Sequence, residues 1–176
     1  MITMWHGGRG LQYSYREIVG NKSKQMEYGP GLYLTNFYMT AVKYAKGGGS
    51  TYKVTFDKGI DIKQVTLKTQ DVLKFIKDNR FTNKKESYEY IKSKYPEYIP
   101  ADNFLNIMIP SLTPSTSSIM RQFLVNHGID YSVNYGYGGF GNQTIVVIFN
   151  PQVITDVVAV KSKDITQEDY ELSVDL

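Results

Sequence analysis

Residues 28–35 read Tyr-Gly-Pro-Gly-Leu-Tyr-Leu-Thr, a glycine-rich approach to a tyrosine, Tyr33. Glycines at such a turn permit backbone conformations that bulkier residues resist. Two more segments complete the pattern, since residues 5–9 read Trp-His-Gly-Gly-Arg and residues 142–147 read Asn-Gln-Thr-Ile-Val-Val. The three segments place His6, Tyr33 and Gln143 in one chain order, and these residues are the candidates for a shared site.

The chain has the length and composition of one globular domain. Its 176 residues are 41% apolar and 14% aromatic, which is enough to build a core, and no repeat or low-complexity tract divides them. We therefore expect a single domain over residues 1–176. No apolar run approaches the ~20 residues that span a bilayer and no leader is visible, so we expect a soluble, cytoplasmic protein without membrane contact.

Cysteine is absent, which excludes disulfides, thiolate nucleophiles and cysteine-based zinc sites. The only imidazoles are those of His6 and His127, and no His-x-x-x-His or Asp-x-Asp spacing organises metal ligands. We therefore expect no metal. A formal net charge of +3 and a pI of about 8.8 make the chain mildly basic, which is compatible with nucleic-acid contact.

Hydrophobic periodicity and turn residues predict an α+β domain with strands at both ends of the chain and helices in its middle. The predicted strands cover residues 2–5, 51–56, 144–149 and 156–160. The predicted helices cover residues 14–19, 37–45 and a helical segment of about 69–127, which includes a helix at 115–126. The expected helix caps are Thr35 with Asn36, and Asn83. Residues 131–141 are expected to form a loop, and the acidic tail from Ser162 to be peripheral.

The three segments resemble motifs of the ADP-ribosyltransferase superfamily of the poly(ADP-ribose) polymerase and diphtheria-toxin type. Residues 5–9 resemble its Trp-His-Gly-Ser-Arg motif, residues 28–35 its Phe-Gly-Lys-Gly-Ile-Tyr-Phe-Ala motif, and residues 142–146 its Asn-Glu-Tyr-Ile-Val strand. The resemblance covers about 55 residues at the start and about 20 near the end. It implies a fold in which two small packed β-sheets form an NAD cleft, here with a helical insertion in the middle.

The resemblance implies NAD as co-substrate and assigns its contacts. His6 would bind the adenosine ribose, because an imidazole hydrogen-bonds hydroxyl groups through either nitrogen. Gly7 would approach the carboxamide, with Gly8 and Arg9 completing this cofactor-binding segment.

Two tyrosines would hold the nicotinamide ring. Tyr44 follows Tyr33 by eleven residues, which is the family's spacing for a second stacking tyrosine. Nicotinamide in NAD is a flat pyridinium cation, so each ring would contribute ~0.5–2 kcal/mol by stacking and cation–π attraction.

The chain departs from the family pattern at three positions. Gly8 and Ala41 stand where the family has serine, so an expected hydrogen bond to the carboxamide is absent. Gln143 stands at the position of the catalytic glutamate, and its amide brings no negative charge to an oxocarbenium-like sugar. We therefore expect a His-Tyr-Gln enzyme that transfers a single ADP-ribose, with Asp130 or Glu27 as a possible assisting carboxylate.

The acceptor is expected to be a macromolecule, with single-stranded RNA or DNA favoured over a protein side chain. Residues 68–97 carry eight basic and five acidic side chains interleaved with aromatics, and this mixture can bind nucleic acid or simply form an amphipathic helical face. By analogy, small members of this superfamily are toxins, antiviral effectors or host-modifying proteins, sometimes with an inhibitor protein or antitoxin. Two alternatives stay open: a catalytically silent NAD or ADP-ribose binding module, and a nucleic-acid-binding protein without chemistry.

Overall fold

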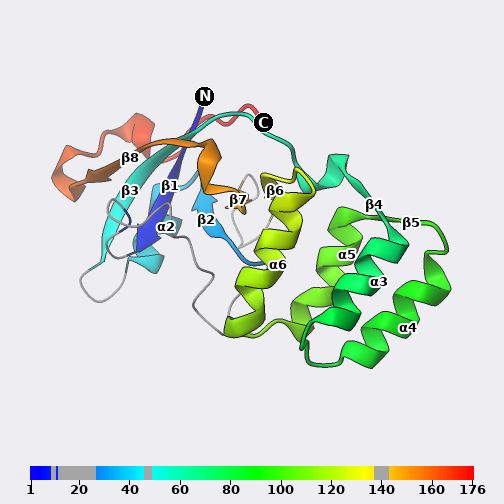
Figure 1. Cartoon of the computed structure of the whole chain (residues 1–176). Coiled ribbons are helices and arrows are strands. Elements are labelled where there is room, and N and C mark those ends of the chain that lie inside the picture. Colours follow the sequence, from blue (N-terminus) through cyan, green and yellow to red (C-terminus); the bar gives the residue numbers. More distant parts are fainter. Residues whose placement is uncertain (9–10, 12–26, 46–48, 137–142) are drawn as a thin grey trace.

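A computed structural model describes residues 1–8, 11, 27–45, 49–136 and 143–176 of the chain. They form a six-stranded antiparallel sheet with a group of helices at one side, which confirms the predicted α+β class (Figure 1). The strand order is β6-β7-β2-β1-β3-β8. These strands are β1 (Ile2–Gly8), β2 (Leu32–Thr35), β3 (Ser50–Phe56), β6 (Tyr131–Tyr135), β7 (Thr144–Ile148) and β8 (Ile154–Val160).

The six-stranded sheet consists of two halves that meet at one point. Strands β1 and β2 share a single registered pair, Trp5 with Thr35, whereas β1 pairs with β3 along its whole length. The halves also pack against each other, because the rings of Phe56 on β3 and Tyr131 on β6 lie 6.0 Å apart although three strands separate β3 from β6. The sheet therefore curls so that alternate side chains of both halves fill one apolar core.

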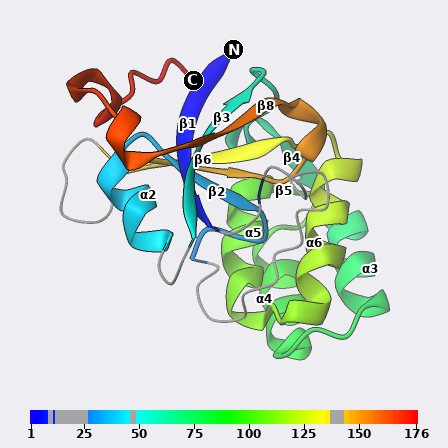
Figure 2. The same ribbon diagram turned by 90° about the vertical axis from the view of Figure 1, so that its left-hand side faces the viewer.

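The helical segment forms a second core on the other face of β7. Helices α3 (Thr69–Asp78), α4 (Lys84–Lys94), α5 (Ala101–Met108) and α6 (Pro114–Asn126) gather at one side of the sheet (Figure 2). A two-stranded sheet of β4 (Thr66–Lys68) and β5 (Tyr98–Pro100) joins them. Their apolar side chains pack on Val147 and Phe149 of the large sheet.

The acidic tail lies at the periphery, as expected, since no residue from Ser162 onward is buried, but it also docks on the sheet. The indole N–H of the fully buried Trp5 donates to the Asp169 carbonyl at 2.8 Å, because a buried donor needs an acceptor. Lys53 forms an ion pair with the Asp169 carboxylate. The tail also accepts the backbone N–H of Tyr38, the first residue of helix α2 (Tyr38–Tyr44). Residues 162–172 thus hold α2 against β1.

Most predicted elements are confirmed, and the differences have local causes. Strand β1 continues to Gly8, and residues 131–135, expected as loop, form β6 because they pair with β7. Strands β2, β4 and β5 and a separate α5 were not predicted. The predicted helix at 14–19 lies outside the described residues.

The expected side-chain caps of α2 and α4 do not form. The N-cap residues are Phe37 and Asn83, and neither makes a side-chain cap hydrogen bond. The Asn36 side chain instead accepts the N–H of Thr144, which joins β2 to β7.

Short 3-10 helices complete the described elements. They are η2 (Ile62–Gln64), η3 (Ile109–Ser111), η4 (Pro151–Val153), η5 (Ser162–Asp164) and η6 (Gln167–Asp169). Within the part of the chain that the structure describes, no helix has the length and apolar character needed to cross a membrane.

Candidate functional site

His6 lies where β1 and β2 separate. Its Nδ1 is 2.9 Å from the Tyr33 carbonyl oxygen, and its ring lies against that of Tyr52, with centroids 6.2 Å apart. Because a carbonyl only accepts, Nδ1 carries the proton, and burial lowers the pKa of His6 so that the ring stays neutral. Its Nε2 is therefore a hydrogen-bond acceptor.

The two glycines after His6 are required by what lies beside them. A Cβ on Gly7 would come 1.8 Å from the Ala41 carbonyl oxygen, so only glycine lets α2 lie against β1 here. A Cβ on Gly8 would come 2.5 Å from Nε2 of His6. A side chain at position 8 would therefore displace the imidazole of His6 from the position it has here.

Tyr33 is held by the turn that precedes it. Its hydroxyl donates to the Gly29 carbonyl at 2.8 Å and accepts the Tyr28 N–H at 3.2 Å. Gly29 has a φ of +104°, a conformation that favours glycine. Burial raises the pKa of Tyr33, and electrostatic repulsion from Glu27, Tyr28 and Tyr44 raises it further. The hydroxyl is therefore a fixed, neutral group.

Tyr44 is the last residue of α2 and is 65% exposed. No hydrogen bond or ring contact joins it to Tyr33 among the described residues, and its electrostatic influence is the smallest of the causes that raise the pKa of Tyr33. Ala41, three residues earlier, is fully buried against Trp5 and Tyr38. The serine expected there would add a hydroxyl to this apolar cluster.

Gln143 is buried directly before β7, with 4% of its surface exposed. Its Nε2 donates to Oγ1 of Thr35 and to Oγ1 of Thr40, both at 3.3 Å. Thr35 Oγ1 also accepts the Phe37 N–H at 3.2 Å, which supports its role as an acceptor. With both amide protons on threonines, the carbonyl Oε1 of Gln143 is its acceptor group.

The sequence patterns do not identify the two threonines as site residues. Thr35 is expected as part of a helix cap, and Thr40 immediately precedes Ala41 on the helix between the two tyrosines. The one sequence feature that could have indicated Thr40 is that it is a polar residue next to Ala41, where the resemblance predicts a contact with the ligand. Thr40 and Thr35 instead orient the Gln143 amide.

The structure brings the three predicted residues into one linked arrangement. His6 bonds to the backbone of Tyr33, and Gln143 bonds to Thr35, which pairs with Trp5 next to His6. The arrangement offers two neutral acceptors for hydroxyl groups and tyrosine rings for a flat ligand. Gln143 itself brings no charge to it.

Asp130 does not belong to this arrangement. Its Oδ2 accepts the Ile60 N–H at 2.8 Å and its Oδ1 accepts the Asn150 side-chain N–H at 2.7 Å. Asn150 follows β7 and Gln143 precedes it, so the two lie roughly 23 Å apart along the strand. Asp130 is therefore not positioned to assist at Gln143.

Arg9, residues 137–141 of the predicted loop and His127 are not part of the arrangement around His6, Tyr33 and Gln143 that the structure describes. Arg9 and residues 137–141 of the predicted loop are outside the described residues. His127 closes α6, where its Nδ1 bonds to the Phe123 carbonyl at 2.8 Å.

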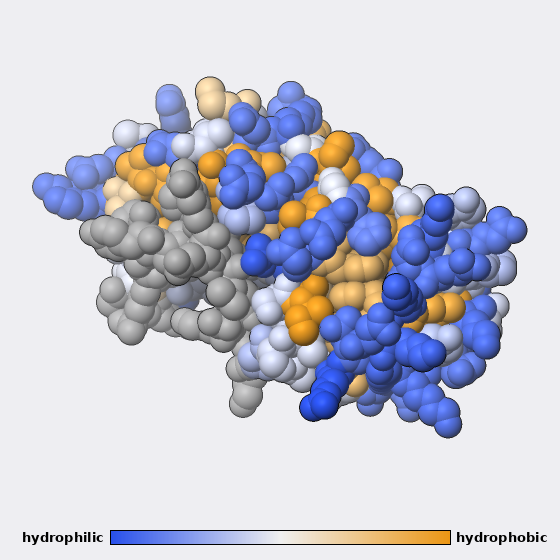
Figure 3. Space-filling view, viewed as in Figure 1, coloured by the Kyte–Doolittle hydropathy of each residue, from blue (hydrophilic) through white to orange (hydrophobic). Residues whose placement is uncertain are grey.

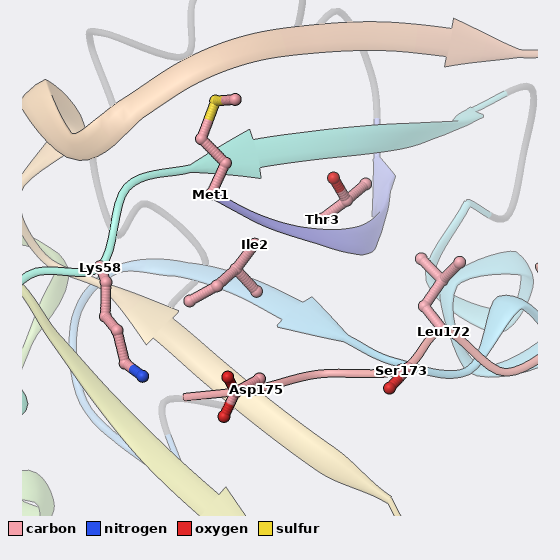
Figure 4. Close-up of a pocket in the computed structure, with 7 residues that line it drawn as sticks. All are labelled: Met1, Ile2, Thr3, Lys58, Leu172, Ser173 and Asp175. Carbon is pink, nitrogen blue, oxygen red and sulfur yellow. The ribbon is translucent and has the colours of Figure 1, made fainter.

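A pocket of about 430 Å³ opens at the start of β1, the opposite end of that strand from His6 (Figure 4). Its lining residues are Met1, Ile2, Thr3, Lys58, Leu172, Ser173 and Asp175. None of the predicted site residues lines it, so the pocket and the candidate site are separate features.

The described residues contain no group of three or more histidine, aspartate or glutamate side chains that could hold a metal ion. Searches of family models, curated proteins and solved structures found no match to this chain.

Proposed function

We propose that this chain is a mono-ADP-ribosyltransferase of the His-Tyr-Glu type with glutamine at the third position. One observation carries the proposal: His6, Tyr33 and Gln143, which are far apart in the sequence, are linked where the two sheet halves meet. The curled halves and the helical segment between them support the two-sheet arrangement that the sequence resemblance implies.

In this proposal NAD binds across the junction of β1 and β2. Nε2 of His6 accepts a hydrogen bond from a hydroxyl of the adenosine ribose, since Nδ1 already donates to Tyr33. The ring of Tyr33 stacks on the nicotinamide, with Tyr44 on its other side. The backbone of Gly7 binds the carboxamide.

The reaction breaks the bond between the nicotinamide nitrogen and the ribose carbon. The electron pair leaves with nicotinamide, which becomes neutral, and the sugar develops oxocarbenium character. Oε1 of Gln143 accepts a hydrogen bond from the ribose 2-hydroxyl and orients the sugar. Because the amide has no charge, it stabilises the cation less than a carboxylate would. The acceptor then attacks the sugar carbon and gives its proton to solvent water, and a single transfer is the outcome.

We propose single-stranded nucleic acid as the acceptor. Tyr90 and Tyr98 are 45% and 55% exposed on the helical segment, and Nζ of Lys94 lies 5.3 Å from the centroid of the Tyr90 ring. Lys68 pairs with Tyr98 across β4 and β5. Hydrophilic side chains cover much of this segment (Figure 3). Such lysine–tyrosine pairs suit phosphates and unstacked bases.

The proposed biological role is that of a small toxin or antiviral effector, and an inhibitor protein is the corresponding partner. This role is an analogy with the superfamily that the sequence resembles.

Transfer of label from NAD tests the enzyme and its acceptor together. The protein is incubated with NAD labelled in the adenosine moiety and a cell lysate, and the product is divided among protease, RNase and DNase. We expect the label to be released by RNase or DNase. Release by protease alone would make a protein side chain the acceptor, and no transfer and no free nicotinamide would contradict the proposal.

The two histidines provide a matched control for the site. Each donates from Nδ1 to a backbone carbonyl, at 2.9 Å for His6 and 2.8 Å for His127. His6→Ala is expected to lower nicotinamide release roughly 100-fold, while His127→Ala leaves it within about twofold of the parent. Equal rates in the two variants would contradict the site assignment.

A silent NAD-binding module is the second candidate. The observation that favours it is the neutral, buried Gln143 amide, which lacks the charge expected of a catalytic group. Such a module would bind NAD in calorimetry and release no nicotinamide, whereas the enzyme would do both.

A further inference from the structure

The turn before β2 places the backbone of an acidic residue, Glu27, near the Tyr33 hydroxyl. The backbone N–H of Tyr28 donates to that hydroxyl at 3.2 Å. Standard bond lengths put the Cα of Glu27 about 2.4 Å from the Tyr28 nitrogen, and hence within about 6 Å of the hydroxyl. Glu27 is therefore attached to the same turn that holds the ring proposed to stack on nicotinamide.

The charge of Glu27 acts on Tyr33. Burial is the largest cause of the raised pKa of Tyr33, and the Glu27 carboxylate contributes to it by repelling the phenolate. The same field that disfavours a negative charge at Tyr33 favours a positive charge stacked on its ring. Glu27 itself is exposed, so its carboxylate is accessible to a ligand.

Two other carboxylates, those of Asp130 and Asp169, are already engaged. Asp130 accepts two hydrogen bonds at the far end of β7, and Asp169 pairs with Lys53. The one ion pair recorded among the described residues is that of Lys53 with Asp169, so Glu27 has no salt-bridge partner there. Gln143 contributes no charge.

We propose that Glu27 supplies the negative charge that selects the cationic nicotinamide of oxidised NAD at the Tyr33 ring. This inference rests on the proposed function. The oxidised ring is a pyridinium cation, whereas the reduced cofactor carries a neutral dihydropyridine, so a carboxylate distinguishes them by charge. When the glycosidic bond breaks, nicotinamide takes the electron pair and becomes neutral, and the attraction that held it ends. Glu27 thus favours both substrate selection and product release.

Binding of oxidised and reduced NAD tests the inference. Calorimetric dissociation constants are measured for the parent, for Glu27→Gln, and for Glu89→Gln as a control on the exposed surface of α4. We expect Glu27→Gln to bind oxidised NAD roughly five- to tenfold more weakly and reduced NAD unchanged, because only the charge term is removed. Glu89→Gln should match the parent for both.

A salt titration separates charge from shape. Raising the salt concentration should weaken binding of oxidised NAD to the parent more than to Glu27→Gln, because screening acts on the charge that the variant lacks. If the parent binds oxidised NAD and Glu27→Gln binds it equally well, the inference is overturned and the proposed function stands. If the parent binds neither form, the proposed function fails, and the inference fails with it.

Discussion

The two ends of the β6–β7 pair use similar polar residues in opposite ways. At one end the Asp130 carboxylate is bonded on both oxygens, to Ile60 and to Asn150, and the Asp130 carbonyl accepts the Phe149 and Asn150 N–H groups. At the other end Gln143 gives its amide protons to two threonines. That arrangement leaves the amide oxygen as the acceptor group, which the proposed function assigns to a ribose hydroxyl.

The difference separates stability from function. Partners at the Asp130 end satisfy partly exposed polar groups and join a loop to two strands, which is what a structural contact requires. Partners at the Gln143 end bond to the amide nitrogen and orient the side chain, which is what the proposed function requires of this position. Substitutions at the first end should therefore change stability, and those at the second should change chemistry.

Gly7→Ala should have the largest effect, because it removes the packing that brings α2 to the Gln143 end. The added Cβ would meet backbone atoms, the Ala41 carbonyl at 1.8 Å, and backbone cannot rotate away. We expect a loss of about 3 kcal/mol in the free energy of unfolding, measured by urea denaturation. In Gly8→Ala the obstacle is the His6 side chain, so its loss should be smaller. Equal losses would contradict the packing argument.

Gln143→Glu should have the next largest effect, on rate rather than on stability. The hydroxyls of Thr35 and Thr40 can reverse and donate to a carboxylate in the same place. The added charge should raise nicotinamide release roughly 10- to 100-fold, because it stabilises the cationic sugar. Gln143→Ala should lower the rate below that of the parent. A Gln143→Glu protein that folds, binds NAD and gains no rate would contradict the role given to this position.

Asp130→Ala should show the converse behaviour. It leaves the Ile60 N–H and the Asn150 amide without their acceptor, so we expect about 2 kcal/mol less stability in urea denaturation. Nicotinamide release per folded molecule should equal that of the parent, because the residue lies at the far end of β7. A loss of rate at unchanged stability would place Asp130 in the site after all.

The sequence predicted elements where the local signal was strong. The period of apolar residues located α3, α4 and α6, and the β-branched run located β7. It did not locate β2, β5 or β6, because those short strands are stabilised by partners distant in the chain and not by a local pattern.

The candidate site follows the same rule as the helices and strands: residues within a local motif could be named from the sequence, and residues brought near them by folding could not. Motif spacing indicated His6, Tyr33 and Gln143, since those residue types follow a chain order. It could not indicate that Thr40 bonds to Gln143, or that Asp130 is engaged at the far end of β7. Those roles depend on distances between elements, which only the folded chain defines.

The smallest expected effect concerns pH and again contrasts a site residue with a structural one. Burial lowers the pKa of His6 below its ordinary value of 6.5, so the unfolded chain binds a proton more readily than the folded one. The stabilising contribution is therefore complete above about pH 6.5 and is lost as the pH falls toward the lowered pKa, with a slope of at most about 1.4 kcal/mol per pH unit. This contribution is measured as the free energy of unfolding of the parent and of His6→Gln, by urea denaturation from about pH 8 to about pH 5, a range that spans the ordinary histidine pKa. As the pH falls, His6→Gln should lose less stability than the parent. The control variant Asp130→Ala, which keeps His6, should lose as much stability as the parent. Parallel plots of unfolding free energy against pH for the parent and His6→Gln would mean that His6 is not held neutral between the sheet halves.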